Sequence, residues 1–329
     1  MKIYRYYIFL MSCLLLTACT QDNEWLNEEK STQQEVVHLN IQNVEIDVNT
    51  RSTTPQDPLT DNPMYNLCLL HYNSEGQLIK GDTQLKDFGE DQPALKYTWS
   101  PTLTIEQNTN PETLCLVANL KGNYPTPWPE RLADLKETCV DLKFGNSGLI
   151  AERKMYMFGY YEGIITAGQN INIMMGRIAA ALKFVITATG ANESSPYKIN
   201  KIEIINTPRQ SYFFPHNSTD GNFSSGSDIS ETFSSNNQIN NKTIRELVFY
   251  YQIGENISPN EKNQTKIIIT AQKRERYNAG SSYRPNYQYR WGKAKSYTVV
   301  LGCDAPGTPN RNYSLYRNNN YTFNINLKD

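Results

Sequence analysis

Few residues of this 329-residue chain have the types and spacing that catalysis needs. Histidine is the commonest general base in enzymes, and the chain has three: His38, His71 and His216. His38 and His71 lie within strand-like runs, so we expect each to be a hydrogen-bonded or exposed strand residue. His216 follows the aromatic segment SYFFP, which favours core packing at the end of a sheet over a binding patch.

The sequence motifs of common enzymes are also missing. The chain contains no nucleophile elbow GxSxG, no P-loop, no HExxH, no GxGxxG and no CxxC. Glycoside hydrolysis needs two carboxylates, but a pair such as Glu152 and Glu162 occurs by chance in any chain of this length. We therefore predict a protein that is not an enzyme, with no catalytic residue, cofactor or metal site.

One cysteine near the N-terminus has a different chemistry. The apolar run Ile8–Ala18 follows a short basic segment and is about half of the ~20 residues that a membrane span needs, which is typical of a signal peptide. Leu-Thr-Ala-Cys at its end resembles a bacterial lipobox, which implies that residues 1–18 are removed and that Cys19 is lipidated. The attached acyl chains would anchor the protein to a membrane, with residues 19–34 as a polar tether.

The cysteines beyond the lipobox are Cys68, Cys115, Cys139 and Cys303. Four cysteines permit two disulfides in an oxidising compartment. However, the runs NLCLLHY and TLCLVANL around the first two are typical of buried strands, where a free thiol packs as a small apolar group. This favours free cysteines, although the sequence leaves the disulfide state open.

Composition and periodicity indicate an all-β protein. The net charge of −1 argues against a nucleic-acid partner, which usually faces a basic surface. Many short apolar or alternating runs are separated by Gly, Pro and Asn turns, a rhythm typical of β-sandwiches. The first run places Val37, Leu39 and Ile41 on one face, and its phase changes after Asn43, which predicts a bulge or a change of sheet there.

Only PERLADLKET has helical spacing, whereas RIAAALKFV fits either a helix or a strand. A domain boundary is predicted near Met174–Gly176, where one strand ends and a longer one begins. This gives an N-terminal β-sandwich over residues 35–175 and a C-terminal one over 176–329.

Three segments together resemble the fimbrillins, the type V pilins of Bacteroidales. They are MYMFGYYEGIITAGQNINIMMGRIAAALKFVI, ELVFYYQIGENIS and LYRNNNYTFNINLKD. Arg177 and Lys183 keep the polar positions of the first segment, and Glu255 and Asn256 match the second. The resemblance implies two transthyretin-like β-sandwiches in tandem.

The resemblance also implies a function as a structural subunit of a cell-surface fimbria, as stalk, tip or anchor. Such a subunit reaches the outer membrane as a surface-exposed lipoprotein and is cut after an arginine, for which Arg51 is the candidate. It then accepts a strand from a neighbouring subunit by β-strand addition. The terminal strand is the candidate donor, or else the fixed last strand of its own domain; its inward residues would be Tyr321, Phe323, Ile325 and Leu327.

Two alternatives remain open at this stage. An anchor subunit would keep its lipid and would not be cut. A surface lipoprotein that never polymerises would instead bind a glycan, a host ligand or a bacterial surface ligand.

Overall fold

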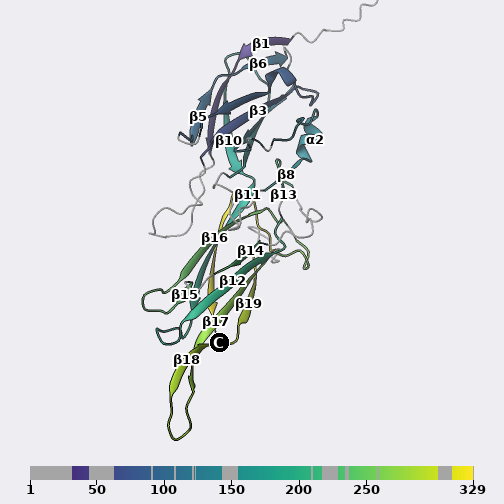
Figure 1. Cartoon of the computed structure of the whole chain (residues 1–329). Coiled ribbons are helices and arrows are strands. Elements are labelled where there is room, and N and C mark those ends of the chain that lie inside the picture. The colour runs from purple at the N-terminus through teal and green to yellow at the C-terminus, as the bar shows by residue number, and fades with distance from the viewer. Residues whose placement is uncertain are drawn as a thin grey trace, which may run out of the picture.

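The computed structural model describes residues 32–43, 63–89, 92–106, 109–120, 122, 124–142, 155–208, 210–216, 229–233, 237–257, 259–302 and 313–328. Within these ranges the protein is built almost entirely of strands, arranged as two β-sandwiches in tandem (Figure 1). The all-β prediction is confirmed, and the transthyretin-like topology stays a prediction.

The N-terminal sandwich is organised by a sheet of seven strands in the order β4-β3-β7-β9-β10-β2-β5. β1 and β6 form a separate two-stranded sheet in the same sandwich. The strands are β1 (Thr32–Val36), β2 (His38–Asn43), β3 (Asn66–Tyr72), β4 (Gln84–Asp87), β5 (Lys96–Trp99), β6 (Thr102–Glu106), β7 (Glu112–Ala118), β9 (Met157–Gly163) and β10 (Asn170–Arg177). β1 begins inside the stretch that we predicted as a tether.

Every residue of the central strands β3 and β7 is buried. Both faces of these strands are therefore covered by other parts of the protein. One face joins β2 and β10 in a core that includes Leu39, Leu69 and Ile173. The other face packs against the short helix α2 (Leu132–Lys136), which PERLADLKET predicted. Two-sided burial explains why these strands are continuously apolar instead of alternating.

The C-terminal sandwich encloses one core between two sheets. A three-stranded sheet has the order β16-β11-β20, and a larger sheet has the order β14-β12-β17-β18, with β15 on β12 and β19 on β17. The strands are β11 (Ala179–Ala188), β12 (Tyr197–Ile205), β14 (Ile229–Thr232), β15 (Gln238–Ile239), β16 (Leu247–Gly254), β17 (Lys266–Asn278), β18 (Tyr287–Trp291), β19 (Lys295–Val300) and β20 (Asn320–Leu327). The ambiguous run RIAAALKFV is therefore strand.

The two sandwiches are joined closely. Ile178 is the only residue between β10 and β11, so one strand direction runs from the first sandwich into the second (Figure 1). β13 (Gln210–Tyr212) pairs antiparallel with β8 (Cys139–Asp141), which links the chain halves a second time. Phe213 and Phe214, which follow β13, pack against the same face of the N-terminal sheet as helix α2. The boundary predicted at residues 175/176 falls within β10.

Candidate functional site: strand β2 and the domain junction

Strand β2 occupies an interior position in the N-terminal sheet. It runs parallel to β10, from Asn170 opposite His38 to Met175 opposite Asn43. On its other side it pairs antiparallel with β5, from Leu39 opposite Trp99 onward. Among the described strands β5 pairs only with β2. Removing β2 would therefore expose the edge of β10 and leave β5 without a partner in the sheet.

The inner face of this segment is fully apolar. Val37, Leu39 and Ile41 are 0%, 0% and 2% exposed, and they pack in the same core as Ile171 and Ile173 of β10. Burial of such a side chain is worth about 1.5–3 kcal/mol, so the three together contribute roughly 5–9 kcal/mol. The alternation predicted from the sequence is confirmed for these residues. Without them the groove beneath would expose a continuous apolar floor.

The outer face of β2 is polar and contacts the parallel strand through side chains. Asn40 Nδ2 donates to Asn172 Oδ1 at 3.1 Å, and Gln42 Nε2 lies 3.0 Å from Met174 Sδ. Exposed neutral contacts of this kind contribute little net stability. They do join residues that are register partners on β2 and β10. Most of the free energy that holds β2 in the sandwich comes instead from its buried apolar face.

The preceding strand, β1, is held by β6 through five antiparallel register pairs, from Thr32 opposite Glu106 to Val36 opposite Thr102. β6 is in turn fixed to the main sheet by side chains. Thr104 donates its backbone N–H to Asp82 Oδ2 at 2.7 Å and its hydroxyl to Asp82 Oδ1 at 2.9 Å. The β1–β6 pair is thus anchored to the sheet by a buried carboxylate.

That carboxylate belongs to a buried network around His71. The imidazole is 0% exposed, with Nδ1 at 2.8 Å from Asp82 Oδ2 and Nε2 at 2.6 Å from Glu112 Oε2. Burial disfavours the charged ring, but the hydrogen bonds to Asp82 and Glu112 outweigh it and raise the pKa of His71. Burial also opposes the charge of Asp82, yet its bonds to His71 and Thr104 lower its pKa.

The network is structural because solvent cannot reach it. Asp82 and Glu112 are 2% and 1% exposed, so no substrate can meet the imidazole. The predicted strand role of His71 is therefore confirmed. His38 Nδ1 lies 2.9 Å from Ser100 Oγ, also as a hydrogen-bonded strand residue.

The remaining histidine lies outside the cores. The His216 ring stacks on Tyr212 with centroids 3.7 Å apart. It lies four residues after the end of β13 and is 22% exposed, so the expected core packing is found for Phe213 and Phe214 and not for His216.

Two of the predicted site residues, Cys19 and Arg51, lie outside the described residues. The chain leaves β2 at Asn43 and re-enters the described region at Pro63. Arg51 belongs to the connection between them, as does the second half of the first predicted strand pattern. Lipidation at Cys19 and cleavage after Arg51 therefore stay predictions.

The predicted donor strand is β20, and in this structure it belongs to its own domain. It runs parallel to β11, with eight register pairs from Asn320 opposite Ala181 to Leu327 opposite Ala188. Its apolar side chains point to the core as expected: Tyr321 and Phe323 are partly buried, and Ile325 and Leu327 are 8% and 0% exposed. In this single chain β20 is the last strand of its own domain, and a role as donor to a neighbouring subunit stays a prediction.

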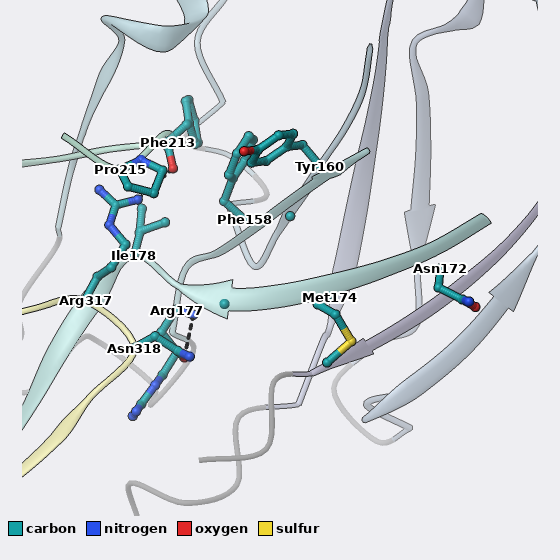
Figure 2. A pocket seen from close by; sticks show the side chains of 12 residues that line it. Phe158, Tyr160, Asn172, Met174, Arg177, Ile178, Phe213, Pro215, Arg317 and Asn318 are labelled. Carbon is teal, nitrogen blue, oxygen red and sulfur yellow. Dashed lines mark hydrogen bonds between the residues drawn. The ribbon is translucent and has the colours of Figure 1, made fainter. Parts of the chain in front are cut away.

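A surface pocket of about 320 Å³ lies between β9, β10 and the segments around Phe213 and Arg317. Figure 2 shows Asn172 and Met174 projecting from β10 at one end, and Phe213 and Pro215 beside Arg317 at the other. None of the described residues that line this pocket is an acid, a histidine or a cysteine. Aromatic, apolar, amide and arginine side chains make up the lining.

The residues that carried the family resemblance meet beside this pocket, although they come from three distant segments. The Arg177 backbone N–H donates to Asn318 Oδ1 at 3.1 Å (Figure 2). Arg317 forms a two-pronged ion pair with Glu255 and donates to the Phe213 carbonyl at 2.7 Å. The sequence supplied the residues and their order, but it carried no signal that they would touch each other.

The cysteines of the described regions are free. Cys68 and Cys115 are buried on the adjacent strands β3 and β7, and Cys139 is partly exposed. Burial raises the pKa of the Cys68 thiol to about 12. The expectation of free, packed thiols is thus confirmed for the first two cysteines, whereas Cys303 lies outside the described residues.

Within the ranges that the structure describes, no group of His, Cys, Asp and Glu side chains is arranged to hold a metal ion. In the same ranges, no helix is long and apolar enough to cross a membrane.

Comparison with solved structures identifies the fold. A proposed cell adhesion protein from Parabacteroides distasonis superposes with a TM-score of 0.60 at 14% identity, over 90% of this chain and 89% of that one. A proposed cell adhesion protein from Bacteroides eggerthii gives 0.55 at 14% identity, over 90% and 87%. The tip fimbrial protein Mfa3 from Porphyromonas gingivalis, with a C-terminal truncation, gives 0.52 at 13% identity, over 90% and 95%.

No protein-family model matches the chain, and no curated protein matches it in sequence. At the identities above, the structural similarity establishes the fold alone. The chain therefore shares the fold of Bacteroidales adhesion and fimbrial proteins, and the fimbrillin-like architecture expected from the sequence is confirmed.

Proposed function

We propose that this protein is a structural subunit of a cell-surface fimbria that assembles by β-strand addition. The observation that carries the proposal is the position of β2. It is an interior strand of the N-terminal sheet, and the connection that contains Arg51 follows it directly. Cleavage after Arg51 would separate β1 and β2 from the rest of the chain, so that β2 could leave the seven-stranded sheet and β1 could leave β6.

Loss of β2 would create a strong acceptor for another strand. The edge of β10 would present unpaired backbone groups beside an apolar floor, a combination that favours pairing with a further chain. An incoming strand would regain the main-chain hydrogen bonds and the burial that Val37, Leu39 and Ile41 now provide. Polymerisation is then driven by the same burial that holds β2 in the monomer.

The candidate donor, β20, has a pattern suited to this groove. Its segment Phe323-Asn324-Ile325 places apolar residues on one face and Asn on the other, as Leu39-Asn40-Ile41 does in β2. β20 also runs parallel to β11, which continues the direction of β10. To act as a donor, β20 would have to leave β11 in its own domain.

The route to the surface follows from the lipobox. Cys19 would carry the lipid that attaches the protein to the outer membrane, until cleavage after Arg51 releases the remainder into the fimbria. Metabolic labelling with an alkyne-tagged fatty acid should mark the wild-type protein, whereas a Cys19→Ala variant should stay unlabelled. Equal labelling of both forms would rule out this attachment.

Cleavage is tested with an arginine-specific protease on the purified protein. We expect a new N-terminus at Ser52, followed by ladders of multimers on denaturing gels run without heating. Arg51→Lys is the matched control, because it keeps the charge and removes the arginine that the protease requires; it should stay uncut and monomeric. Cleavage elsewhere, or a cut protein that stays monomeric, would contradict assembly by this route.

The outcome also separates the alternatives. A protein that stays lipidated and uncut on cells, yet is found within fimbriae, acts as an anchor. A protein that is neither cut nor part of any fimbria is instead a non-polymerising surface lipoprotein, whose role would be to bind a glycan or another surface ligand.

A further inference from the structure

The hairpin formed by β17 and β18 extends beyond the C-terminal sandwich (Figure 1). Residues 266–271 of β17 lie between β12 and β19. From Arg274 to Asn278, β18 is the only described strand that pairs with β17. A hairpin of this length buries no core of its own, so the side chains of its outer part are available for contacts with other molecules.

The segment from the middle of β17 to the start of β19, which contains the outer part of the hairpin, is strongly basic, unlike the rest of the chain. Residues 273–295 contain seven Lys or Arg and a single acidic residue, Glu275, a net charge of +6. The whole chain has a net charge of −1, so the remainder carries −7. The charge near zero therefore conceals a local positive field, which attracts anions and raises their local concentration.

Cations and aromatic rings alternate along one face of this hairpin, which we call the β17–β18 ladder. Arg274 lies opposite Trp291, and Arg276 lies opposite Tyr289, so these side chains share a face. The Arg276 guanidinium carbon is 3.7 Å from the centroid of the Tyr287 ring, and that of Arg274 is 4.8 Å from the Tyr289 ring.

The ladder continues onto the sandwich. Lys198 of β12 lies opposite Gln272 of β17, two residues before Arg274, and therefore on the same face. Its Nζ is 4.7 Å from the centroid of the Trp291 ring. The ladder therefore consists of three cations and three rings: Lys198, Trp291, Arg274, Tyr289, Arg276 and Tyr287.

The ladder is exposed and its charge is not neutralised. Tyr287 and Tyr289 are 54% and 42% exposed. Among the described residues, neither Arg274 nor Arg276 forms an ion pair. The single nearby acid, Glu275, lies opposite Arg290 on the other face. A row of cations with free hydrogen-bond donors remains on the ladder face.

We propose that the β17–β18 ladder binds an acidic polysaccharide through its carboxylate or sulfate groups. The planar guanidinium fork is suited to two-pronged recognition of such oxyanions. The alternation along a straight strand offers a repeating ligand several equivalent contacts, and the tyrosines hold the guanidinium groups in place.

Single-stranded nucleic acid is the less suitable occupant. Such binding relies on bases that stack on open aromatic faces. In the ladder a cation already lies over one face of each ring, with its ammonium nitrogen or guanidinium carbon 3.7 to 4.8 Å from the ring centroid. The ring faces that the cations cover are not available for a base to stack on. This binding site is independent of strand addition and can be tested on the uncut monomer.

The test is a binding series on the uncut protein at fixed physiological salt. The immobilised probes are heparin, polygalacturonate, neutral dextran and oligo(dT), and binding is followed by biolayer interferometry. We expect binding to one or both of the acidic polysaccharides and none to dextran. Tighter binding to oligo(dT) than to either acidic polysaccharide, or no binding to any probe, would overturn the proposal.

Two single substitutions, each of which removes one positive charge, distinguish binding at the ladder from general attraction to the basic segment. Arg276→Gln removes a cation from the ladder and should weaken binding by about tenfold, the typical effect of losing one charged hydrogen bond. Arg290→Gln removes the same charge from the opposite face and should change affinity by less than about threefold, through general electrostatics. Equal losses would show that the ladder is not a site. Circular dichroism of both variants confirms that the fold is intact.

Discussion

Replacing His71 with phenylalanine tests the buried network that anchors β6. The substitution keeps a ring of similar size and removes both donors that now serve Asp82 and Glu112. Breaking a buried ion pair by removing one partner costs about 3–5 kcal/mol, because the other charge stays buried. That is a large part of the ~5–15 kcal/mol that stabilises an ordinary domain.

The pH dependence of stability gives the sharper prediction. Because the pKa of His71 is raised above its ordinary 6.5, its contribution is fully present below pH 6.5 and is lost as the pH rises through the folded-state pKa. Because the pKa of Asp82 is lowered from 3.8, its contribution is present above pH 3.8 and is lost as the pH falls through the lowered value. The network should therefore stabilise most between pH 3.8 and 6.5.

The assay is urea unfolding followed by tryptophan fluorescence from pH 3 to pH 9. We expect the gap in unfolding free energy between wild type and His71→Phe to be largest between these two pH values. His38→Phe is the control, since His38 is partly exposed with a single hydrogen bond to Ser100, and it should change stability by less than about 1 kcal/mol.

A loss below about 1 kcal/mol for His71→Phe, with a pH profile parallel to wild type, would refute the reasoning. If the variant does not fold, Thr104→Val replaces it. This change removes one hydroxyl bond to Asp82 and should cost about 1.5–3 kcal/mol within the same pH window.

Three further predictions test packing and thiol chemistry. Leu39→Ala should lower the unfolding free energy of the uncut protein, measured in urea, by about 2–5 kcal/mol, because it leaves a cavity in the core. Asn40→Ala on the outer face is the control and should cost less than about 1 kcal/mol. Equal losses would contradict the assigned faces. Gly159→Ala should cost about 1–3 kcal/mol in thermal unfolding, because its Cβ would come within 2.5 Å of a backbone oxygen of β10; an unchanged midpoint would disprove this tight contact. In the native protein iodoacetamide should modify partly exposed Cys139 and leave Cys115 intact until denaturant is added, as read by peptide mass spectrometry; early modification of Cys115 would place it nearer the surface.

Local sequence patterns predicted the elements that bury one face, because burial of one face imposes a regular spacing of apolar residues. The alternation of Val37, Leu39 and Ile41 identified β2 and its inner face, because burial on one side imposes a period of two. The spacing of Leu132 and Leu135 identified the helix. The alanines of β11 were ambiguous, since alanine fits a helix as well as a strand, and only pairing with β16 and β20 decides the outcome.

Features that depend on distant parts of the chain could not be predicted. β1 has the sequence TQQEV, without apolar alternation, and becomes a strand because β6 supplies backbone partners. The ion pair between Arg317 and Glu255 joins residues 62 positions apart. His71 looked like an ordinary strand residue because its two acidic partners lie 11 and 41 positions away.

The single residue between β10 and β11 has a mechanical consequence. Ile178 donates its backbone N–H to the Tyr156 carbonyl, and its own carbonyl accepts from the Ser211 hydroxyl, so neither backbone group is free to rotate. These two hydrogen bonds and the β8–β13 pair restrain the backbone at the junction between the sandwiches. If subunits join by strand addition as proposed, a restrained junction would place the bending of the fibre where one subunit meets the next, and the strength of those joints would decide how far the fibre can flex before it breaks.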